Sequence, residues 1–294
     1  MAHNKATIEE RVRAYQDEFS VLLPPGAVIP MHSERGHFYK ASSSGQTYGS
    51  VTEKLKCIKD ESIQNFALNE GMRYIEANLS KVVGPSGINM IKAIDMFDAA
   101  KKASSGVLSD AGDIGNRIHD RRDNYFQNWI DTGTKPDMAL FIFENDDPRL
   151  IAAMKGLEKF VVDYDYRPIR TELMLVSHKY KVGGTLDDVG LARFPGEKNH
   201  QLVLMDLKTS NQFKAHYWLQ VALYHIMLRE ITGINTKRHF ILKLSKETPT
   251  YKVEEITSMA KVAQGVRYLL KVDEAMNFIK ETRSQINKKN LIVL

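Results

Sequence analysis

The run VLMDLKT at residues 203–209 constrains the fold more than any other part of the chain. Side chains alternate between the two faces of a strand, so a strand here places Asp206 and Lys208 on one face, roughly 6 to 7 Å apart. The residues around them are mostly apolar. The pattern therefore predicts an apolar strand that holds a carboxylate and an ammonium group in one pocket.

A second acidic residue follows a pair of glycines upstream. The segment KVGGTLD at residues 181–187 is typical of the end of a strand, and its glycines permit close backbone approach or a bulge just before Asp187. Between the two segments lie Pro195-Gly196 and Lys198-Asn199, which favour turns. We therefore expect an antiparallel pair in which Asp187 faces Asp206.

Two carboxylates beside a lysine suit a divalent metal ion. Mg²⁺ and Mn²⁺ prefer oxygen ligands, and an ion held by Asp187 and Asp206 would polarise a phosphate oxygen and activate water. Lys208 would stabilise the developing charge or orient the attacking water. The motifs predict phosphodiester hydrolysis, although either motif alone is more often a surface ion pair or a turn.

A helical segment further along the chain strengthens this interpretation. His216, Gln220 and Tyr224 recur at every fourth position of the segment HYWLQVALY. On a helix this spacing forms one polar and aromatic stripe in an otherwise apolar segment. A helix with only a structural role would rarely place a glutamine there.

Together these motifs resemble the PD-(D/E)XK nuclease superfamily, in particular its RecB-like exonuclease branch, which includes phage exonucleases and the mitochondrial genome-maintenance exonuclease. The family core has an acid after a glycine-containing strand, a D-x-K on the next strand and a helix with Q-x-x-x-Y. Those positions are filled here by Asp187, by Asp206 with Lys208, and by Gln220 with Tyr224. The resemblance implies an α/β fold with a restriction-endonuclease-like core, a central mixed β-sheet flanked by helices, and an α-rich N-terminal part.

The RecB-like branch also carries a G-x-x-x-H signature on a helix upstream of the core. Residues 115–119, GNRIH, match it on an expected helix at residues 113–131. An apolar face on that helix is expected from Ile114, Ile118, Tyr125 and Trp129. In the branch this histidine contributes to the metal site, so the resemblance implies the same role for His119.

The resemblance also implies the other metal ligands. Asp187 and Asp206 would bind the ion directly, together with that histidine and the backbone carbonyl of Leu207. Glu172 occupies a position where the branch commonly has an acid on the first core strand. Asp123 stands where the branch often has a glutamate, one turn after the histidine. The implied cofactor is Mg²⁺ or Mn²⁺.

A further set of residues would act on DNA. Lys208 would orient the attacking water or stabilise the developing charge. Gln220 would position Lys208, the water or the DNA backbone. Tyr224 would support that helix face or contact a phosphate. Arg117 and Arg121 are candidates for electrostatic contacts with phosphates, although an ordinary solvated face would also explain them.

Composition agrees with this assignment and narrows it. The 294 residues, 43% of them hydrophobic, can bury a substantial core, and the net charge of +5 is compatible with a polyanionic partner without identifying one. The single Cys57 leaves no internal disulfide framework and excludes the four-cysteine iron–sulfur cluster of related nucleases. We find no phosphate-binding loop motif, and therefore expect no nucleotide cofactor.

We expect no membrane association. No stretch approaches the roughly 20 apolar residues of a membrane span, and the N-terminal segment is too acidic for a transit or secretory peptide. These features predict a cytoplasmic protein, and the resemblance to phage exonucleases implies that the cell is a bacterium or a phage-infected host.

The expected organisation is an N-terminal helical region at residues 1–110, which could arch over the active site, and a nuclease core at 111–294. An irregular stretch is expected at 24–46. Helices are expected at 5–20, 51–79, 88–103, 113–131, 147–164 and 259–285, and later strands at 238–243 and 250–256. On the last helix, the residues expected to face inward are Leu269, Leu270, Val272, Met276 and Ile279.

The predicted function is that of a metal-dependent DNA exonuclease in recombination, replication or repair. Its expected partner is DNA with free ends, and a single-strand-binding or recombination protein is a further candidate. Two alternatives stay open at this point. One is a structure-specific endonuclease of the same fold, and the other is a catalytically inactive DNA-binding or interaction module.

Overall fold

The computed structural model describes residues 6–33, 36–55, 61–84, 87–210 and 213–291. The chain divides into two compact units, one formed by residues 1–57 with 118–294 and the other by residues 58–117. This division differs from the boundary expected at residue 110. One helix, α4 (Met90–Thr132), begins in the second unit and ends in the first.

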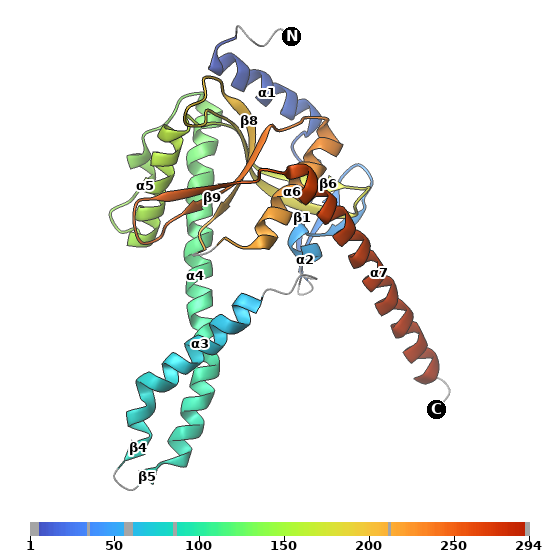
Figure 1. The fold of residues 1–294 in the computed structure, drawn as a ribbon. Coiled ribbons are helices and arrows are strands. Elements are labelled where there is room, and N and C mark those ends of the chain that lie inside the picture. The colour runs from blue at the N-terminus through green and yellow to red at the C-terminus, as the bar shows by residue number, and fades with distance from the viewer. Residues whose placement is uncertain (1–5, 34–35, 56–60, 85–86, 211–212, 292–294) are drawn as a thin grey trace. The chain divides into compact units, whose positions relative to one another are not determined.

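A five-stranded mixed sheet forms the centre of the larger unit, in the order β10-β9-β8-β7-β6 (Figure 1). β8 and β9 are parallel, and the other neighbouring pairs are antiparallel. The strand that carries the D-x-K motif is therefore the middle strand, where apolar residues can be covered on both faces. The strands are β6 (Arg167–Ser177), β7 (Val182–Ala192), β8 (Gln201–Lys208), β9 (Arg238–Leu244) and β10 (Tyr251–Glu255).

Helices cover both faces of this sheet. Phe160 of α5 (Pro148–Asp163) packs on Phe240 of β9, with ring centroids 5.9 Å apart. The next residue on the strand, Ile241, belongs to a core cluster that includes Val221 of α6 (Ala215–Thr232). Because successive residues of a strand point to opposite faces, α5 and α6 lie on opposite sides. The predicted mixed α/β arrangement with flanking helices is confirmed.

The N-terminal stretch expected to be irregular instead forms a small antiparallel sheet in the order β1-β2-β3. It follows the predicted first helix, α1 (Ile8–Leu22), which begins with a capping box between Thr7 and Glu10. Pro30 lies in β1, at an edge of the sheet, where its missing N–H is tolerated. The bounds are β1 (Val28–Ser33), β2 (Gly36–Ala41) and β3 (Thr47–Gly49).

α4 also corrects the prediction, because one helix of 43 residues replaces the two expected at 88–103 and 113–131. Gly106 and Gly112 lie in the segment between them, but no proline does. Glycine weakens a helix by about 1 kcal/mol, whereas proline also removes a hydrogen bond. The expected apolar face is confirmed, since Ile114, Ile118, Tyr125 and Trp129 are all buried.

The helix expected at 51–79 is found as two helices, α2 (Val51–Leu55) and α3 (Glu61–Asn78), and residues 56–60 lie outside the described ranges. In the smaller unit, a short antiparallel ladder of β4 (Val83–Gly84) and β5 (Gly87–Ile88) follows α3. Within the described ranges, each unit also contains a 3-10 helix: η1 (Leu79–Lys81) in the smaller unit and η2 (Met138–Phe141) in the larger one.

The last helix, α7 (Met259–Leu291), has the predicted position but not the predicted burial. Leu269 and Leu270 pack against the core as expected. Val272, Met276 and Ile279 do not, because they are 55%, 47% and 48% exposed. Over the described ranges, no helix combines the length and the apolar character needed to cross a bilayer.

Candidate metal centre

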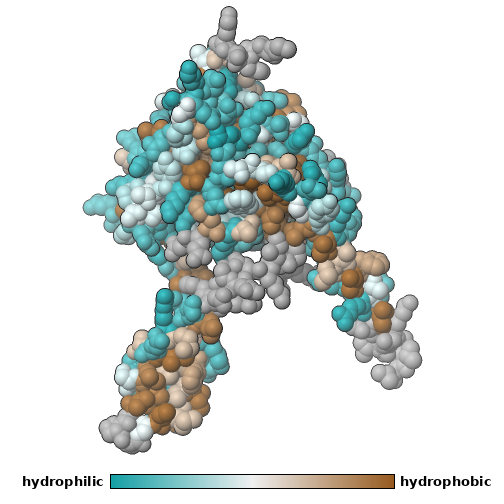
Figure 2. All heavy atoms as spheres, viewed as in Figure 1, coloured by the Kyte–Doolittle hydropathy of each residue, from teal (hydrophilic) through white to brown (hydrophobic). Residues whose placement is uncertain are grey.

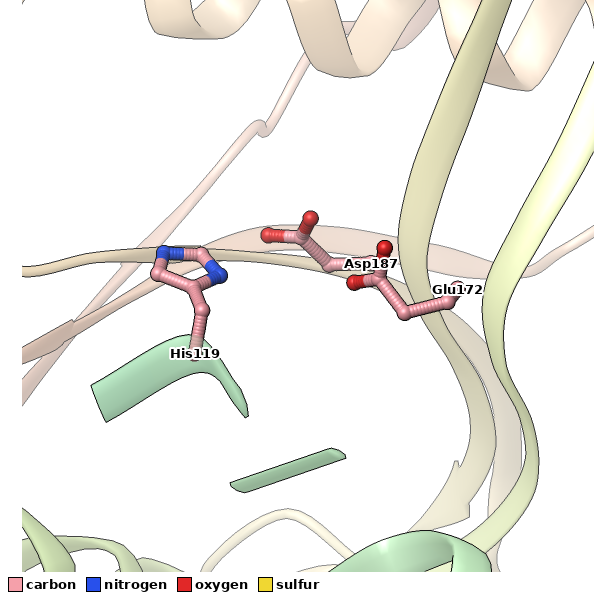
Figure 3. A group of neighbouring side chains, drawn as sticks. All are labelled: His119, Glu172 and Asp187. Atoms are coloured by element: carbon pink, nitrogen blue, oxygen red, sulfur yellow. The ribbon is translucent and has the colours of Figure 1, made fainter. Parts of the chain in front are cut away.

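His119, Glu172 and Asp187 place one potential ligand atom each within 4.8 Å of one another (Figure 3). The imidazole comes from α4, and the carboxylates come from the neighbouring strands β6 and β7. Within the described part of the chain, no other group of at least three His, Cys, Asp or Glu side chains has this geometry. The structure thus brings three sequence-predicted residues together.

Glu172 is held in an unusual backbone conformation. Its φ of 49° lies in the left-handed region, which side chains other than glycine, asparagine and aspartate rarely adopt. The residue lies between the paired positions Thr171–Asp188 and Leu173–Leu186, in the part of the ladder that follows a register shift between Pro168 and Arg170. Burial and the nearby carboxylates of Asp123 and Asp187 raise the pKa of Glu172 to about 8. Strain and crowded negative charge are typical of a functional position.

Asp187 stands where β7 and β8 stop pairing. The antiparallel pairing of these strands, which was predicted, reaches Asp188 opposite Met205. One position further, the carboxylate of Asp187 accepts a hydrogen bond from the backbone N–H of Leu207 at 2.6 Å. Burial opposes ionisation, but His119, cationic neighbours and this hydrogen bond hold the pKa of Asp187 below its usual value. The sequence had suggested that Asp187 lies near the end of a strand, but the structure places it within β7.

Asp206 and Lys208 share one face of β8, as predicted, and their charged atoms lie 2.6 Å apart. Asp206 is fully buried. Burial raises its pKa to about 7, with Lys208 opposing the shift and Asp187 adding to it. Burial also disfavours the charged form of Lys208, but Asp206 and Asp187 outweigh it and raise the pKa of the ammonium group. The pair is therefore a cation and an acid held together in an apolar setting.

His119 is uncharged at neutral pH. Burial, together with the charges of Arg122 and Lys208, lowers its pKa to about 4, although Asp187 opposes the change. A neutral imidazole keeps a lone pair that can bind a metal. This state of the ring is the one that the predicted ligand role requires.

The helix motif lies next to the glycine pair of β7. The Tyr224 hydroxyl is hydrogen-bonded to the side chain of Gln220. A Cβ atom on Gly184 would lie 2.7 Å from Cε1 of Tyr224, and one on Gly183 would lie 2.3 Å from Cβ of Tyr39. The two glycines therefore allow aromatic side chains from α6 and β2 to approach the strand, which explains the close approach that was expected there.

Sequence reasoning missed Arg122 and its partner Asp188. Both side chains are buried, and they form an ion pair. The guanidinium also lies 2.8 Å from the Asp123 carboxylate, 3.2 Å from that of Glu172 and 3.4 Å from Nδ1 of His119. A signal was available in the sequence, because Asp188 follows Asp187 on a strand and must face the opposite, apolar side, where an acid needs a basic partner.

The two arginines suggested as phosphate contacts differ in their surroundings. Arg121 forms a bidentate ion pair with Asp146, at 2.6 and 3.1 Å, and donates to the carbonyl of Phe141. Its side chain is only 16% exposed, so these contacts indicate a structural role for Arg121. Arg117 is exposed and belongs to the unit of residues 58–117.

No model of a protein family matches the sequence, and a comparison with curated proteins finds no similar one. Among solved structures, a protein of Eubacterium rectale named for an inferred exonuclease activity is 14% identical, with a TM-score of 0.35 over 55% of this chain and 65% of its own length. An alkaline exonuclease from Laribacter hongkongensis is 15% identical, with a TM-score of 0.29 over 58% of this chain and 92% of its own. At such scores an activity must be inferred from the side chains of the site.

Proposed function

We propose that this chain is a divalent-metal-dependent deoxyribonuclease that acts as an exonuclease on DNA ends or single strands. The observation that carries the proposal is the pair of Asp206 and Lys208, with charged atoms 2.6 Å apart, in electrostatic contact with the carboxylate of Asp187. A carboxylate and an ammonium group beside candidate ligands can hold a cation and stabilise charge on a phosphate.

The donor atoms fit a hard divalent cation. Apart from the Lys208 ammonium, no donor within the described ranges reaches the buried carboxylate oxygens of Asp206. The other lone pairs of this buried carboxylate are unsatisfied, which is costly, and a bound cation would remove that cost. Asp187, Asp206 and His119 would hold the ion, with Glu172 as a further ligand. The carbonyl of Leu207 is included because of the family resemblance.

The charge balance favours the same ion. The cationic side chains that interact with the acids of this centre are Arg122 and Lys208. The acids are five in number: Asp123, Glu172, Asp187, Asp188 and Asp206. Burial and mutual repulsion of these acids raise the pKa of Glu172 to about 8 and that of Asp206 to about 7. A divalent cation would stabilise the ionised forms. Mg²⁺ or Mn²⁺ is expected because carboxylates provide most of the ligands.

The side chains would divide the reaction between them. When bound, the metal ion would polarise a phosphate oxygen and make a water molecule more acidic. Lys208, kept protonated by its acidic neighbours, would donate a hydrogen bond to a phosphate oxygen or orient the attacking water. Gln220, anchored to the Tyr224 hydroxyl, would position Lys208, the water or the DNA backbone.

The substrate would be DNA with free ends, and the expected processes are recombination, replication or repair. The preference for ends rests on the G-x-x-x-H signature that includes His119. Arg117 remains a proposed contact for phosphates, whereas Arg121 is left out because Asp146 already occupies its guanidinium.

One assay tests the activity. Purified protein is incubated with Mg²⁺ or Mn²⁺ and with single- and double-stranded oligonucleotides labelled at the 5′ or the 3′ end. We expect metal-dependent ladders whose direction reports polarity, and no cleavage of a covalently closed single-stranded circle. Cleavage of the circle would instead support the endonuclease alternative.

Variants connect that activity to the site. Asp206→Ala and Lys208→Ala are expected to abolish cleavage without unfolding the protein. Lys252→Ala, which removes an exposed lysine from β10 of the same sheet, should cleave like the parent chain and serves as the matched control. Undiminished cleavage by either site variant would refute the proposal. Metal binding without turnover would favour an inactive binding module.

A further inference from the structure

A hollow of about 530 Å³ lies between α6, α7 and the edge strand β10. Glu254 of β10 lines it and is paired with Ile241 of β9, so the hollow is on the face of the sheet that α6 covers. Its volume is within the roughly 300–1,000 Å³ of sites that bind small organic groups. Figure 2 shows hydrophobic residues beside hydrophilic ones around the first turns of α7, which form one wall.

Aromatic and aliphatic side chains form the floor of this hollow. Phe213 and Trp218 contribute rings, and Leu219 and Val262 complete the apolar surface. All four pack against the main core but are only partly buried. The core therefore holds them in place while their outer surfaces stay open to a ligand. Rings attract other rings beyond the area that they bury, so a flat aromatic group is a suitable ligand.

Positive charge surrounds the aromatic floor. Lys214 and Lys261 line the hollow together with the acidic Glu254. The ammonium group of Lys243 lies 5.7 Å from the centre of the Phe213 ring. Rings with ammonium groups around them fit a nucleotide, which joins an aromatic base to a negatively charged phosphate. An apolar side chain of a partner protein would gain nothing from the lysines.

Two contacts connect the hollow with Lys208. Lys243 of β9 is the paired neighbour of Lys208 on β8, so both side chains lie on one face of the sheet, on strands about 5 Å apart. On α6, the ring of Tyr217 lies 5.0 Å from the Lys208 ammonium group, and the next residue is Trp218. The aromatic floor therefore begins one strand away from the proposed catalytic lysine.

We propose that this hollow is a stacking site for an unpaired base of the DNA strand that is bound at Lys208. The base stacks on the rings of Trp218 and Phe213, and Lys243 binds the neighbouring phosphate. This inference rests on the proposed nuclease function, because it takes DNA as the ligand, and it adds the form of the DNA. A base is open to stacking only where its strand is unpaired, so the site favours single strands and frayed ends over intact duplex.

Binding without cleavage tests the site. A fluorescent single-stranded oligonucleotide is titrated with the protein at low salt in a chelator, and the anisotropy gives Kd. Trp218→Leu removes the ring but keeps an apolar side chain, and it should weaken binding at least about fivefold. Trp218→Phe keeps a ring and should bind nearly as tightly as the parent chain. Phe143→Leu is the matched control, because it removes a ring that is 57% exposed elsewhere in the larger unit.

Tryptophan fluorescence reports the contact directly. The chain has two tryptophans, and the other one, Trp129, is only 6% exposed. Single-stranded DNA should quench the emission of the parent chain, and Trp218→Phe should lose this quenching while it keeps the affinity. Binding that Trp218→Leu leaves unchanged, or quenching that persists in Trp218→Phe, would overturn the proposal.

Oligonucleotides with one abasic position identify the stacked base. The abasic position is moved along the strand, and at one place it should cost the parent chain as much affinity as Trp218→Leu does. At that place it should cost the Trp218→Leu variant little more, because the base and the ring contribute through one contact. Losses that add in full at every position would overturn the contact. Thermal unfolding of each variant establishes that the fold is kept.

Lys243→Gln tests the phosphate contact. The slope of log Kd against log salt should decrease by about 0.7, the value for one phosphate contact of a single strand. Lys237→Gln is the matched control, since it changes an exposed lysine just before the opposite end of β9. Equal slopes for the parent chain and Lys243→Gln would overturn the role of Lys243.

These measurements are independent of the cleavage assay. A chain that binds single-stranded DNA through Trp218 without cleaving it would refute the nuclease function and support the stacking site. A chain that cleaves DNA, but whose affinity and quenching do not depend on Trp218, would support the function and overturn the site. A parent chain that binds no single-stranded DNA would also overturn the site.

Discussion

Arg122 lies buried between two elements of the site and forms an ion pair with the equally buried Asp188. The same guanidinium donates a hydrogen bond to the carbonyl of Asp187 at 3.2 Å and another to the carboxylate of Glu172 at 3.2 Å. One side chain of α4 therefore contacts both acidic strands of the candidate centre. The positions of Asp187 and Glu172, two of the proposed metal ligands, therefore depend on their hydrogen bonds with Arg122.

Arg122→Leu is expected to destabilise the protein by about 3–5 kcal/mol, because it leaves Asp188 buried without a counter-charge. Urea unfolding of the variant measures the loss. The double variant Arg122→Leu with Asp188→Leu removes both charges and should recover most of the free energy of unfolding. It should not restore the arrangement of Asp187 and Glu172, so we expect cleavage to stay low. A single variant within about 0.5 kcal/mol of the parent would contradict a structural role for the pair.

Gly184→Ala tests the packing of β7 against α6. The added Cβ would lie 2.7 Å from Cε1 of Tyr224 and 2.8 Å from Cγ2 of Val51, so one of them must move. Overpacking of this kind costs about 1–3 kcal/mol. Gly265→Ala is the matched control, because a Cβ there meets nothing within 4 Å and alanine favours the helix. Equal stability of the two variants, measured by thermal unfolding, would contradict the close approach.

Local patterns identified the centre of the fold but not its surroundings. Asp206 and Lys208 could be placed together because alternation on a strand is a property of a few adjacent residues. The ion pair of Arg122 and Asp188 joins residues that are 66 positions apart. Strand alternation indicates that Asp188 needs a basic partner, but no local pattern identifies Arg122 as that partner. The sheet that contains Pro30 was missed because edge strands are short and half exposed, and so show weak alternation.

Periodicity has a related limit on α7. It correctly grouped Leu269, Val272, Met276 and Ile279 on one side of the helix. It could not tell whether that side meets the core of the same chain or another surface, because both give the same pattern. The difference is visible only in the exposure of the last three residues.

Glu172→Asn separates stability from activity at a strained position. Asparagine tolerates the φ of 49° better than glutamate and is not an acid that folding must bury and protonate, so the metal-free protein should gain up to about 1 kcal/mol. Cleavage should fall at least about tenfold because a ligand is lost. Unfolding in the presence of a chelator and cleavage over a Mn²⁺ titration measure the two effects.

The control for that variant is Glu172→Gln, which removes the same carboxyl group but keeps a side chain that disfavours left-handed backbone. It should lose activity without gaining as much stability as the asparagine variant. If the asparagine variant is the less stable of the two, backbone strain at this position is not the cause.

A buried network outside the site should make stability depend on pH. Nε2 of His239 lies 2.8 Å from both the Thr236 hydroxyl and Nδ1 of His225, and burial lowers the pKa of His239 to about 3 and that of His225 to about 4. Both pKa values lie below the pKa of about 6.5 that histidine has in the unfolded chain. At pH values between the folded and the unfolded pKa, the unfolded state therefore binds more protons than the folded state. The stabilisation is complete above that unfolded value and is lost as the pH falls below it.

His239→Gln removes one titrating ring from this network while keeping a side chain that can form hydrogen bonds. Between about pH 7 and about pH 4.5, the free energy of unfolding of the parent should fall by about 2 kcal/mol more than that of the variant. The comparison is made between the two proteins because Glu172 and Asp206, whose raised pKa values act in the opposite sense, contribute equally to both. Urea unfolding across this range measures the difference, and parallel curves would show that His239 is not held neutral in the folded protein.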